Sequence, residues 1–181
     1  MDSVIFHVII GALILVGTDA CADPLELNKC YRFESVNFEG EFIQHSKWEL
    51  WKKPGVGMAN WEHSTWKVVP AVNGDSKHIS LEALNFPGYQ INHAGFKGFL
   101  KKCSENCKEN ASWAVKNGFM KSTYCEGTVS FESFNYPGYH LRHSSHRLII
   151  SPYQRTDIYE KDASWVYREV SCKKNFQCAA P

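Results

Sequence analysis

Short runs of alternating apolar and polar residues recur along the chain. Two clear examples are Tyr31 to Val36 (YRFESV) and Thr128 to Phe134 (TVSFESF). Successive side chains of a strand point to opposite faces, so a period of two predicts strands that bury one face. No stretch of helix length carries apolar residues at the period of an amphipathic helix. The pattern therefore predicts an all-β chain.

Turn signals separate the predicted strands. Asn85-Phe86-Pro87-Gly88 and Asn135-Tyr136-Pro137-Gly138 place proline and then glycine in the centre of a turn. Proline fixes φ at about −65° and glycine accepts a positive φ, which is the combination that a type II turn requires. A third segment, Asn37-Phe38-Glu39-Gly40, lacks the proline but keeps the glycine.

A thirteen-residue motif occurs three times in the chain. The copies align without a gap and each ends in histidine: Phe33 to His45 (FESVNFEGEFIQH), Leu81 to His93 (LEALNFPGYQINH) and Phe131 to His143 (FESFNYPGYHLRH). Glutamate, asparagine, an aromatic residue, glycine and the final histidine recur at fixed offsets. Self-similarity at a fixed period is the signature of repeat architectures.

A four-residue landmark follows each copy of the motif. The landmarks end in tryptophan and read His63-Ser64-Thr65-Trp66, Asn110-Ala111-Ser112-Trp113 and Asp162-Ala163-Ser164-Trp165. These tryptophans are 47 and 52 residues apart, and the motif starts are 48 and 50 residues apart. Because the motif and the landmark recur with nearly the same spacing, they indicate three related units of about fifty residues.

Three β-rich units of this length predict a β-trefoil, in which each unit closes one third of a barrel and its cap. The units are expected at about residues 28–75, 76–125 and 126–175. A three-bladed toroid is disfavoured because propellers usually have four or more blades, and a sandwich with coincidental duplication is the other alternative. The expected core residues are Phe33, Leu81, Phe131 and the three landmark tryptophans, with Val36, Leu84 and Phe134 partly buried.

The first residues of the chain are typical of an export signal. Val4 to Val16 is apolar except for His7, and it is shorter than the about 20 residues that span a bilayer. Ala20-Cys21-Ala22 has the small-x-small pattern of a signal-peptidase site. We therefore expect a signal peptide over residues 1–22, a mature domain over residues 23–181, secretion to the extracellular space and no membrane insertion.

Cysteine usage supports the same compartment. Of the 7 cysteines in the sequence, Cys21 leaves with the predicted signal peptide, and an even number remains. Exported chains with an even cysteine count usually form disulfides. Cys103 and Cys107 are candidates for a local pair, and Cys30 is a candidate partner for Cys172 or Cys178, which would join the two ends of the domain.

Charge and hydropathy exclude other classes of function. The formal net charge is +1 and charges of both signs are mixed along the chain, so the sequence lacks the excess of positive charge that is typical of nucleic-acid-binding proteins. The mean hydropathy of −0.36 excludes a protein with several membrane spans. No phosphate-binding glycine loop or paired metal-binding motif occurs in the sequence, so we expect no cofactor and no metal.

Polar residues recur at two positions that together suit sugar binding. The first position is the strand-end histidine of the motif (His45, His93 and His143), and the second opens the landmark (His63, Asn110 and Asp162). A carboxylate accepts hydrogen bonds from adjacent hydroxyls, and an imidazole donates to a sugar oxygen. A nearby tyrosine offers an apolar face. The alternative is that these histidines hydrogen-bond backbone carbonyls in turns.

The third unit carries a resemblance to a known family. Phe131 to His143, followed by Arg147-Leu148 and by Asp162 to Trp165, resembles the arabinose-binding module of fungal α-L-arabinofuranosidase B, which is carbohydrate-binding module family 42. The resemblance extends over all three units. It implies a β-trefoil that binds arabinofuranosyl side chains of hemicellulose, without the catalytic domain of the family.

The resemblance also implies that the strand-end histidine and the landmark acid hold the sugar. The third unit matches both positions with His143 and Asp162, and Tyr139 lies nearby. The second unit has His93 and Asn110, and the first has His45 and His63. Asn110-Ala111-Ser112 is also an N-glycosylation sequon, so a glycan on Asn110 would cover the second site.

These observations predict a secreted, non-catalytic, lectin-like protein that binds furanosyl or related sugars, with its best site in the third unit. The expected partner is carbohydrate, and the oligomeric state stays open. The rival prediction is a secreted β-trefoil that acts by protein–protein contact, as an inhibitor or signalling factor, because two units lack the acid. A third alternative is a glycosidase that uses carboxylates among Asp157, Glu160 and Asp162.

Overall fold

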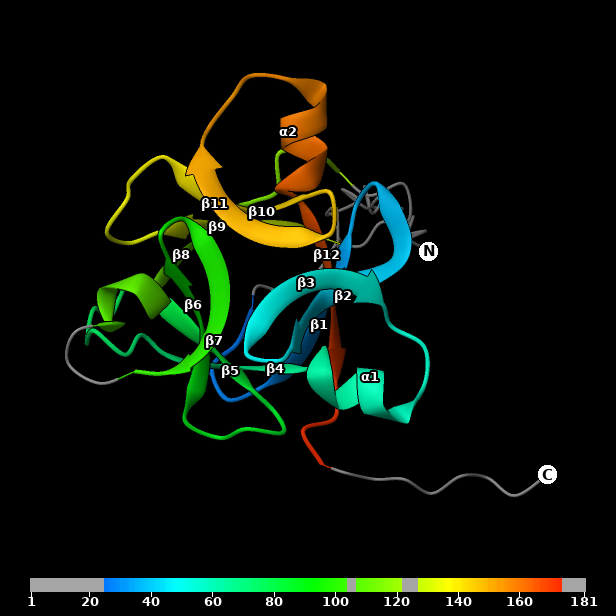
Figure 1. The fold of residues 1–181 in the computed structure, drawn as a ribbon. Coiled ribbons are helices and arrows are strands. Elements are labelled where there is room, and N and C mark those ends of the chain that lie inside the picture. The colour runs from blue at the N-terminus through cyan, green and yellow to red at the C-terminus, as the bar shows by residue number, and fades with distance from the viewer. Residues whose placement is uncertain (1–24, 104–106, 122–126, 174–181) are drawn as a thin grey trace, which may run out of the picture.

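The computed structural model describes residues 25–103, 107–121 and 127–173 (Figure 1). Strands dominate these residues, as the alternating pattern predicts, and short helical turns interrupt them. The predicted signal peptide, Cys125 and Cys178 lie outside the described residues. Within the described ranges, no helix has the length and apolarity needed to cross a membrane.

The strands follow one another in chain order with short connections. The first four are β1 (Cys30–Ser35), β2 (Phe38–Ser46), β3 (Glu49–Pro54) and β4 (Trp66–Pro70). The next four are β5 (Ile79–Ala83), β6 (Tyr89–Ala94), β7 (Lys97–Lys102) and β8 (Trp113–Asn117). The last four are β9 (Thr128–Ser133), β10 (Tyr139–Ser144), β11 (Arg147–Pro152) and β12 (Trp165–Val170). Helical turns precede the tryptophan strands: α1 (Met58–His63), the 3₁₀ turn η2 (Glu109–Ala111) and α2 (Asp157–Asp162).

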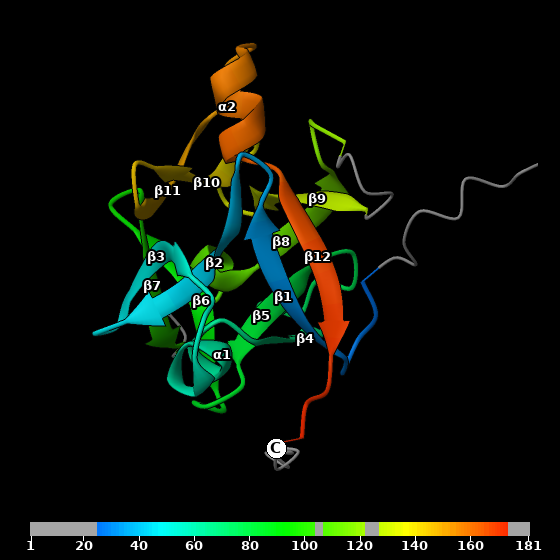
Figure 2. The same cartoon turned by 90° about the vertical axis from the view of Figure 1, so that its right-hand side faces the viewer.

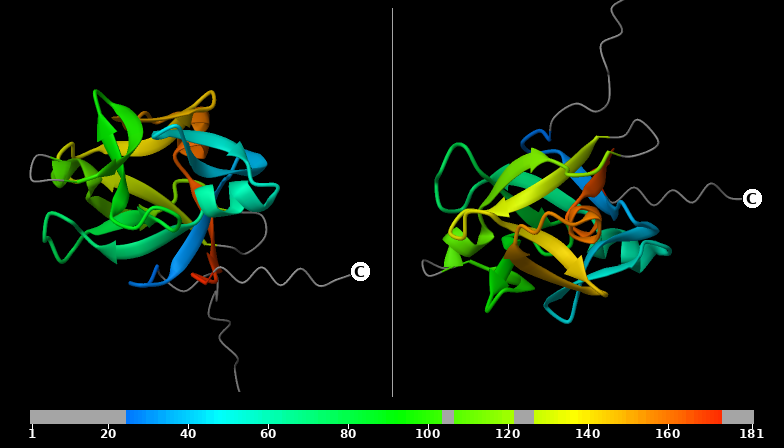
Figure 3. Two further views of the ribbon diagram at one scale, coloured as in Figure 1. Left: turned by 60° about the horizontal axis from the view of Figure 1, so that its bottom comes forward. Right: turned by 90° about the horizontal axis from the view of Figure 1, so that it is seen from above.

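These strands form one continuous sheet that closes into a barrel (Figures 1 and 3). The 12-stranded sheet runs in the order β10-β11-β3-β2-β1-β12-β9-β8-β5-β6-β7, and β4 pairs with β1 and β5. Further pairings join β10 to β9, and β7 to β3 and β11. The prediction of an all-β fold is confirmed, but the prediction of a β-trefoil of three repeats is wrong.

The reason for the difference lies in strand edges. An unpaired strand edge exposes backbone donors and acceptors that need partners. Here the edges of each fifty-residue segment find those partners in another segment, since β4 pairs with β5, β8 with β9 and β12 with β1. The sequence period therefore marks recurring local features within one barrel, and the predicted unit boundaries stay a prediction.

Three hairpins contact one another in a closed ring. They are β2–β3, β6–β7 and β10–β11, each paired in continuous antiparallel register. A backbone carbonyl at each hairpin tip accepts a hydrogen bond from the second strand of the next hairpin. The three bonds run from Leu100 N to Trp48 O (2.9 Å), from Ile150 N to Phe96 O (2.9 Å) and from Lys52 N to His146 O (2.7 Å). Each hairpin therefore both donates and accepts one of these bonds.

The core contains the residues that the sequence predicts. Phe33, Leu81 and Phe131 are fully buried, and the rings of Phe33 and Phe131 meet edge to face with centroids 5.1 Å apart. Val36, Leu84 and Phe134 are partly buried, as expected. Aromatic pairs in this geometry contribute stability beyond the area that they bury.

The three landmark tryptophans are also fully buried, and each anchors a hairpin. Every indole Nε1–H donates to the carbonyl of the residue two positions before a motif histidine. The acceptors are Ile43 O for Trp66 (3.0 Å), Ile91 O for Trp113 (3.2 Å) and Leu141 O for Trp165 (3.2 Å). Because a buried donor needs a partner, these bonds fix both the indole and the strand that carries the histidine.

The motif glutamate and glycine form the turn that the sequence predicts. Gly88 and Gly138 have φ of 83° and 81°, in the left-handed region that favours glycine. The backbone N–H of Gly88 donates to Glu82 Oε2 (3.0 Å), and that of Gly138 donates to Glu132 Oε1 (2.7 Å). The recurrent glutamate therefore caps the turn of its own motif.

We expect Gly138→Ala to destabilise the protein by on the order of 1 kcal/mol, because alanine is strained at a positive φ. A Cβ atom at Gly138 meets nothing within 4 Å, so strain is the only cost. Urea unfolding would measure the change. Gly118→Ala is the contrasting variant, since its Cβ would overlap Thr128 Oγ1 and the substitution should cost more. Equal losses for the two variants would contradict the argument.

Two disulfides fall where the cysteine spacing predicts. Cys30 pairs with Cys172, which joins β1 to the segment after β12, and Cys103 pairs with Cys107. Figure 2 shows β1 and β12 side by side, in agreement with their antiparallel register from Cys30 opposite Val170 to Ser35 opposite Trp165. The first bridge therefore closes the barrel where the described chain begins and ends.

Candidate functional site

Short helical turns place the first residue of each landmark. α1 ends at His63, η2 contains Asn110 and α2 ends at Asp162. The hydroxyl directly before each landmark tryptophan bonds a carbonyl four residues back: Thr65 Oγ1 to Trp61 O (2.7 Å), Ser112 Oγ to Lys108 O (2.9 Å) and Ser164 Oγ to Glu160 O (2.7 Å). These bonds satisfy carbonyls at the helix end and fix the chain where it turns into the strand.

The motif histidines lie near the ends of β2, β6 and β10, and each packs against its landmark tryptophan. The ring centroids are 5.9 Å apart for His45 and Trp66, 5.8 Å for His93 and Trp113, and 6.0 Å for His143 and Trp165, all edge to face. All three histidines are buried. The three histidines therefore occupy equivalent places, each beside its landmark tryptophan.

An asparagine from another copy of the motif completes each cluster. The Nε2–H of each histidine donates to an asparagine Oδ1: His143 to Asn37 (3.0 Å), His93 to Asn135 (3.1 Å) and His45 to Asn85 (2.8 Å). In two clusters, the asparagine Nδ2–H₂ also donates to the landmark residue, from Asn37 to Asp162 (2.9 Å) and from Asn135 to Asn110 (2.6 Å). The sequence analysis missed these asparagines as site residues, although their recurrence in the motif was the available signal.

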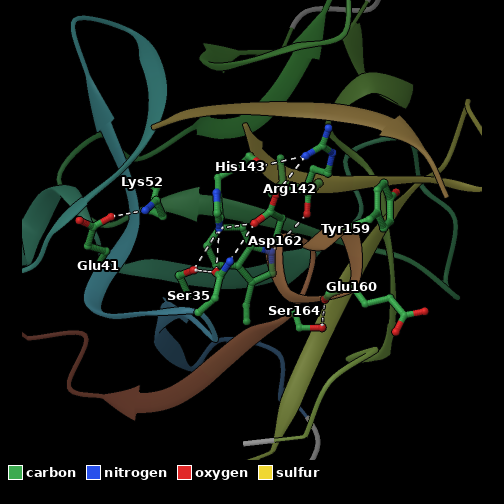
Figure 4. Close-up of polar contacts among 12 residues, drawn as sticks. Ser35, Glu41, Lys52, Arg142, His143, Tyr159, Glu160, Asp162 and Ser164 are labelled. Atoms are coloured by element: carbon green, nitrogen blue, oxygen red, sulfur yellow. Dashed lines mark hydrogen bonds and ion pairs between the residues drawn. The ribbon is translucent and has the colours of Figure 1, made fainter. Parts of the chain in front are cut away.

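The His143 cluster contains the carboxylate that the sequence predicts (Figure 4). His143 Nε2 lies 3.2 Å from Asp162 Oδ1 and 3.2 Å from Ser35 Oγ. Asp162 Oδ2 accepts from Arg142 Nη1 at 3.2 Å, and the Asp162 side chain is 10% exposed. A carboxylate offers about four acceptor positions. Asn37 and Arg142 use two of them, because the single N–H of a neutral His143 is already donated to Asn37 Oδ1, and acceptor positions remain for a ligand.

The His93 cluster replaces the carboxylate with an amide and adds aromatic rings. His93 Nε2 also lies 2.9 Å from Ser133 Oγ. The Tyr136 ring lies 5.6 Å from the His93 ring. Tyr136 in turn contacts Phe96 at 5.3 Å and Tyr139 at 5.5 Å. These three rings form the aromatic wall of the His93 cluster. The structure thus places Tyr139, which the sequence assigned to the third unit's site, in the aromatic wall that contacts His93.

The His45 cluster pairs two imidazoles beside a second aromatic wall. The rings of His45 and His63 lie 4.7 Å apart, so the predicted partners do meet. Phe86 lies 5.5 Å from His45, and it contacts Trp48 at 5.2 Å and Tyr89 at 6.0 Å. The predicted site residues therefore gather in three clusters, with Tyr139 in the His93 cluster.

The side chains next to the His143 ring differ from the aromatic walls of the other two clusters. Phe38 lies 5.4 Å from the His143 ring, as Phe86 and Tyr136 do in the other clusters. The ammonium of Lys52 lies 3.1 Å from the centroid of the Phe38 ring and is paired with Glu41. A charged pair therefore stands where the other clusters carry further aromatic rings.

Burial keeps the cluster histidines neutral. It lowers the pKa of His143 to about 4, although the Asp162 carboxylate acts in the opposite direction. Burial likewise lowers the pKa of His45 and of His93, against the hydrogen bonds to Asn85 and Asn135. A neutral imidazole carries one N–H, and the asparagine oxygens accept it at Nε2.

These lowered pKa values predict acid sensitivity. Between pH 6.5 and about 4 the unfolded chain binds protons on His143 that the folded chain does not, so stability is full above pH 6.5 and falls as the pH drops. We expect the Tm to fall by on the order of 5 °C across this window, with His45 and His93 adding to the loss. Thermal melts from pH 7.5 to 4.5 would measure it. The exposed His146→Asn variant should keep the same profile, and a flat profile in the wild type would contradict the prediction.

Other acidic residues of α2 are engaged elsewhere. Asp157 Oδ2 pairs with Lys161 at 2.8 Å, and Glu160 Oε1 accepts from the Tyr153 hydroxyl at 2.6 Å. Of the three carboxylates considered for glycoside cleavage, Asp162 is the one in a cluster with a histidine. Among the residues whose positions are described, no group of three or more His, Cys, Asp or Glu side chains is arranged to hold a metal ion.

Solved structures with a similar fold include a glycosidase, proteins bound to saccharides and a mosquitocidal holotoxin. A GH54 α-L-arabinofuranosidase complexed with arabinofuranosyl-α-1,2-xylobiose matches with a TM-score of 0.68 and 18% identity over 80% of this chain and 32% of that chain. SeviL bound to asialo-GM1 saccharide matches with a TM-score of 0.57 and 8% identity over 80% of this chain and 99% of that chain. At these identities the likeness shows the fold alone.

A lectin from Polyporus squamosus, bound to the epitope Neu5Acα2-6Galβ1-4GlcNAc, also matches, with a TM-score of 0.60 and 11% identity over 81% of this chain and 50% of that chain. No curated protein sequence matches this chain. The chain spans about a third of the arabinofuranosidase that it resembles.

The family match assigns this closed all-β chain to the class of carbohydrate-binding domains. The sequence matches the family described as the α-L-arabinofuranosidase B (ABFB) domain over residues 21–110 and 101–178. The chain belongs to this family, as the resemblance of the third unit implies. The family domain is a carbohydrate-binding module that occurs in an enzyme.

Proposed function

We propose that this protein is a secreted, non-catalytic lectin-like protein that binds furanosyl or related sugars. Its principal site is the His143 cluster. The binding is reversible recognition, in which Asp162 accepts hydrogen bonds from sugar hydroxyls and His143 orients the carboxylate.

The observation that carries this proposal is the preorganised carboxylate of Asp162. Asn37 and Arg142 donate to it and His143 Nε2 lies 3.2 Å from it, so it is held in one orientation with acceptor positions left for a hydroxyl. Charge-assisted hydrogen bonds are stronger than neutral ones. Groups that are already fixed lose little further freedom on binding, which favours affinity.

The other two clusters support weaker or different binding. Asn110 offers an amide and His63 an imidazole in place of the carboxylate, so the charged acceptor is missing and each hydrogen bond there is weaker. The aromatic walls over His93 and His45 offer apolar faces to the C–H groups of a sugar ring. Several weak sites on one chain raise the total affinity for a branched polysaccharide by avidity.

A glycan panel tests the proposed function. The chain from Asp23 to Pro181, produced with its disulfides, would be applied to immobilised arabinofuranosyl, galactosyl and acidic glycans. Selective binding to sugar is the expected result, together with no release of sugar from chromogenic arabinosides. A folded protein that binds nothing on the panel would refute the proposal, and sugar release would refute its non-catalytic part.

A second candidate function is protein recognition by the same surface. Trp48 and Phe96 are 51% and 47% exposed, and both have positive φ in the hairpin turns. Exposed aromatic residues are enriched in protein interfaces. Under this alternative, Trp48→Ala would weaken capture of a protein partner while Asp162→Ala would not.

Asn110 is proposed as a glycosylation site that competes with ligand at the His93 cluster. Its side chain is partly buried and accepts from Asn135, and the Ser112 hydroxyl of the sequon is fully buried. Attachment must therefore precede folding, and a glycan on Nδ2 would occupy the space beside the cluster while Oδ1 can still accept from Asn135. Mass spectrometry of secreted protein, before and after deglycosylation, should show one glycan that Ser112→Ala removes. An unmodified Asn110 would contradict this expectation.

A further inference from the structure

Lys52 is a charged residue whose side chain is buried like those of the hydrophobic core. Its side chain is 1% exposed, and the residue is among the largest fully buried side chains of the protein. It lies seven residues after His45. The residues seven positions after His93 and His143 are Leu100 and Ile150, and both belong to the hydrophobic core.

Glu41, the ion-pair partner of Lys52, also differs from the residues at the equivalent positions of the other two motif copies. Glu41 lies four residues before His45, and the equivalent residues before His93 and His143 are Tyr89 and Tyr139. Each tyrosine packs in an aromatic wall. Where the second and third motif copies and the strands that follow them carry a tyrosine and an aliphatic residue, the first carries a pair of opposite charges.

This pair lies beside the one cluster that has a carboxylate. Phe38 joins the two features, because its ring contacts both His143, at 5.4 Å between centroids, and the Lys52 ammonium, at 3.1 Å. Figure 4 shows Lys52 and Glu41 on one flank of His143 and Arg142 on the other. The Glu41 side chain is 21% exposed, so it is more accessible than its buried partner.

Stability alone does not account for such a pair. Removing two charges from water is costly, and well-packed apolar residues often replace a buried ion pair without loss of stability. The equivalent apolar solution is present twice in the same chain, as Tyr89 with Leu100 and as Tyr139 with Ile150. Lys52 fixes the carboxylate of Glu41 beside the His143 cluster, where an acceptor can meet a ligand.

We propose that Glu41, held by Lys52, determines the specificity of the His143 cluster. In place of a stacking face it presents a second hydrogen-bond acceptor. The cluster therefore selects sugars that turn a hydroxyl toward this wall, because a carboxylate accepts hydrogen bonds from hydroxyls and an aromatic ring face offers an apolar contact. This inference rests on the proposed function of the cluster.

The test compares three forms of the mature chain. They are the wild type, the double variant Glu41→Tyr/Lys52→Leu, which introduces the residues found at the equivalent positions of the second motif, and the control Lys29→Gln/Glu169→Gln, which removes an exposed ion pair outside the three clusters. The probes are methyl glycosides of arabinofuranose, galactose and galacturonic acid, with affinities from calorimetry. We expect the double variant to lose about tenfold in affinity for its preferred neutral glycoside, as for one lost charge-assisted hydrogen bond. Its relative affinities for the three glycosides should change, while Lys29→Gln/Glu169→Gln keeps the wild-type preference.

Melting temperatures complete the test. If the pair is retained for recognition, the double variant should melt at or above the wild-type temperature. A large fall in Tm would overturn the inference, since the pair would then be structural. Affinities and preferences that stay within twofold of wild type would overturn it too, while leaving the proposed function intact. A wild type that binds none of the sugars would refute both.

Discussion

Replacing Asp162 by asparagine should lower the affinity of the His143 cluster for its sugar by about 10- to 100-fold. A hydrogen bond to a charged group contributes about 1.5–3 kcal/mol, and a neutral one contributes less. The variant also leaves Arg142 without its carboxylate partner. Calorimetric titration with the best ligand from the glycan panel measures the loss.

The converse change provides a matched control for this variant. Asn110→Asp introduces a carboxylate at the equivalent position of the His93 cluster, where Asn135 already donates to residue 110. It should strengthen sugar binding at that cluster and also remove the glycosylation sequon. Asp162→Asn with unchanged affinity would show that the carboxylate does not contact the ligand, and would refute the proposed site.

Replacing Trp113 by alanine should destabilise the protein by about 3–5 kcal/mol, the range for large aromatic residues deleted from a core. The indole is fully buried, and its loss leaves the Ile91 carbonyl without its indole donor and removes the ring that packs against His93. Urea unfolding measures the free energy, and the disulfides remain intact in the assay.

Trp48→Ala is the matched control for size and chemistry. Trp48 is 51% exposed, so truncation should change the free energy of unfolding by far less. Its positive φ adds a reason for a small effect, because alanine tolerates that conformation no worse than tryptophan does. A loss below about 1 kcal/mol for Trp113→Ala would contradict the assigned anchoring role.

Much of the local structure could be predicted from the sequence, because it depends on residues close together in the chain. The alternation around Phe33 and Phe131 predicts buried strands, and Gly88 and Gly138 mark their turns. The spacing of Cys103 and Cys107 predicts a local bridge. Each of these features is confirmed.

The remaining features depend on contacts between distant segments. The trefoil prediction failed because strand partners across the sheet are not encoded in the spacing of any one unit. Asn37 and Asp162 are separated by 125 residues, so nothing local shows that they meet. The helices α1 and α2 are 6 residues each, too short for a helical period to stand out in the sequence.

The asparagine bridges have a consequence for any fragment of the chain. Every cluster takes its histidine from one copy of the motif and its asparagine from another, as with His143 and Asn37. A fragment that carried one copy of the motif would hold the histidine of one cluster and the asparagine of a different one, so it could complete a cluster only by associating with a second chain.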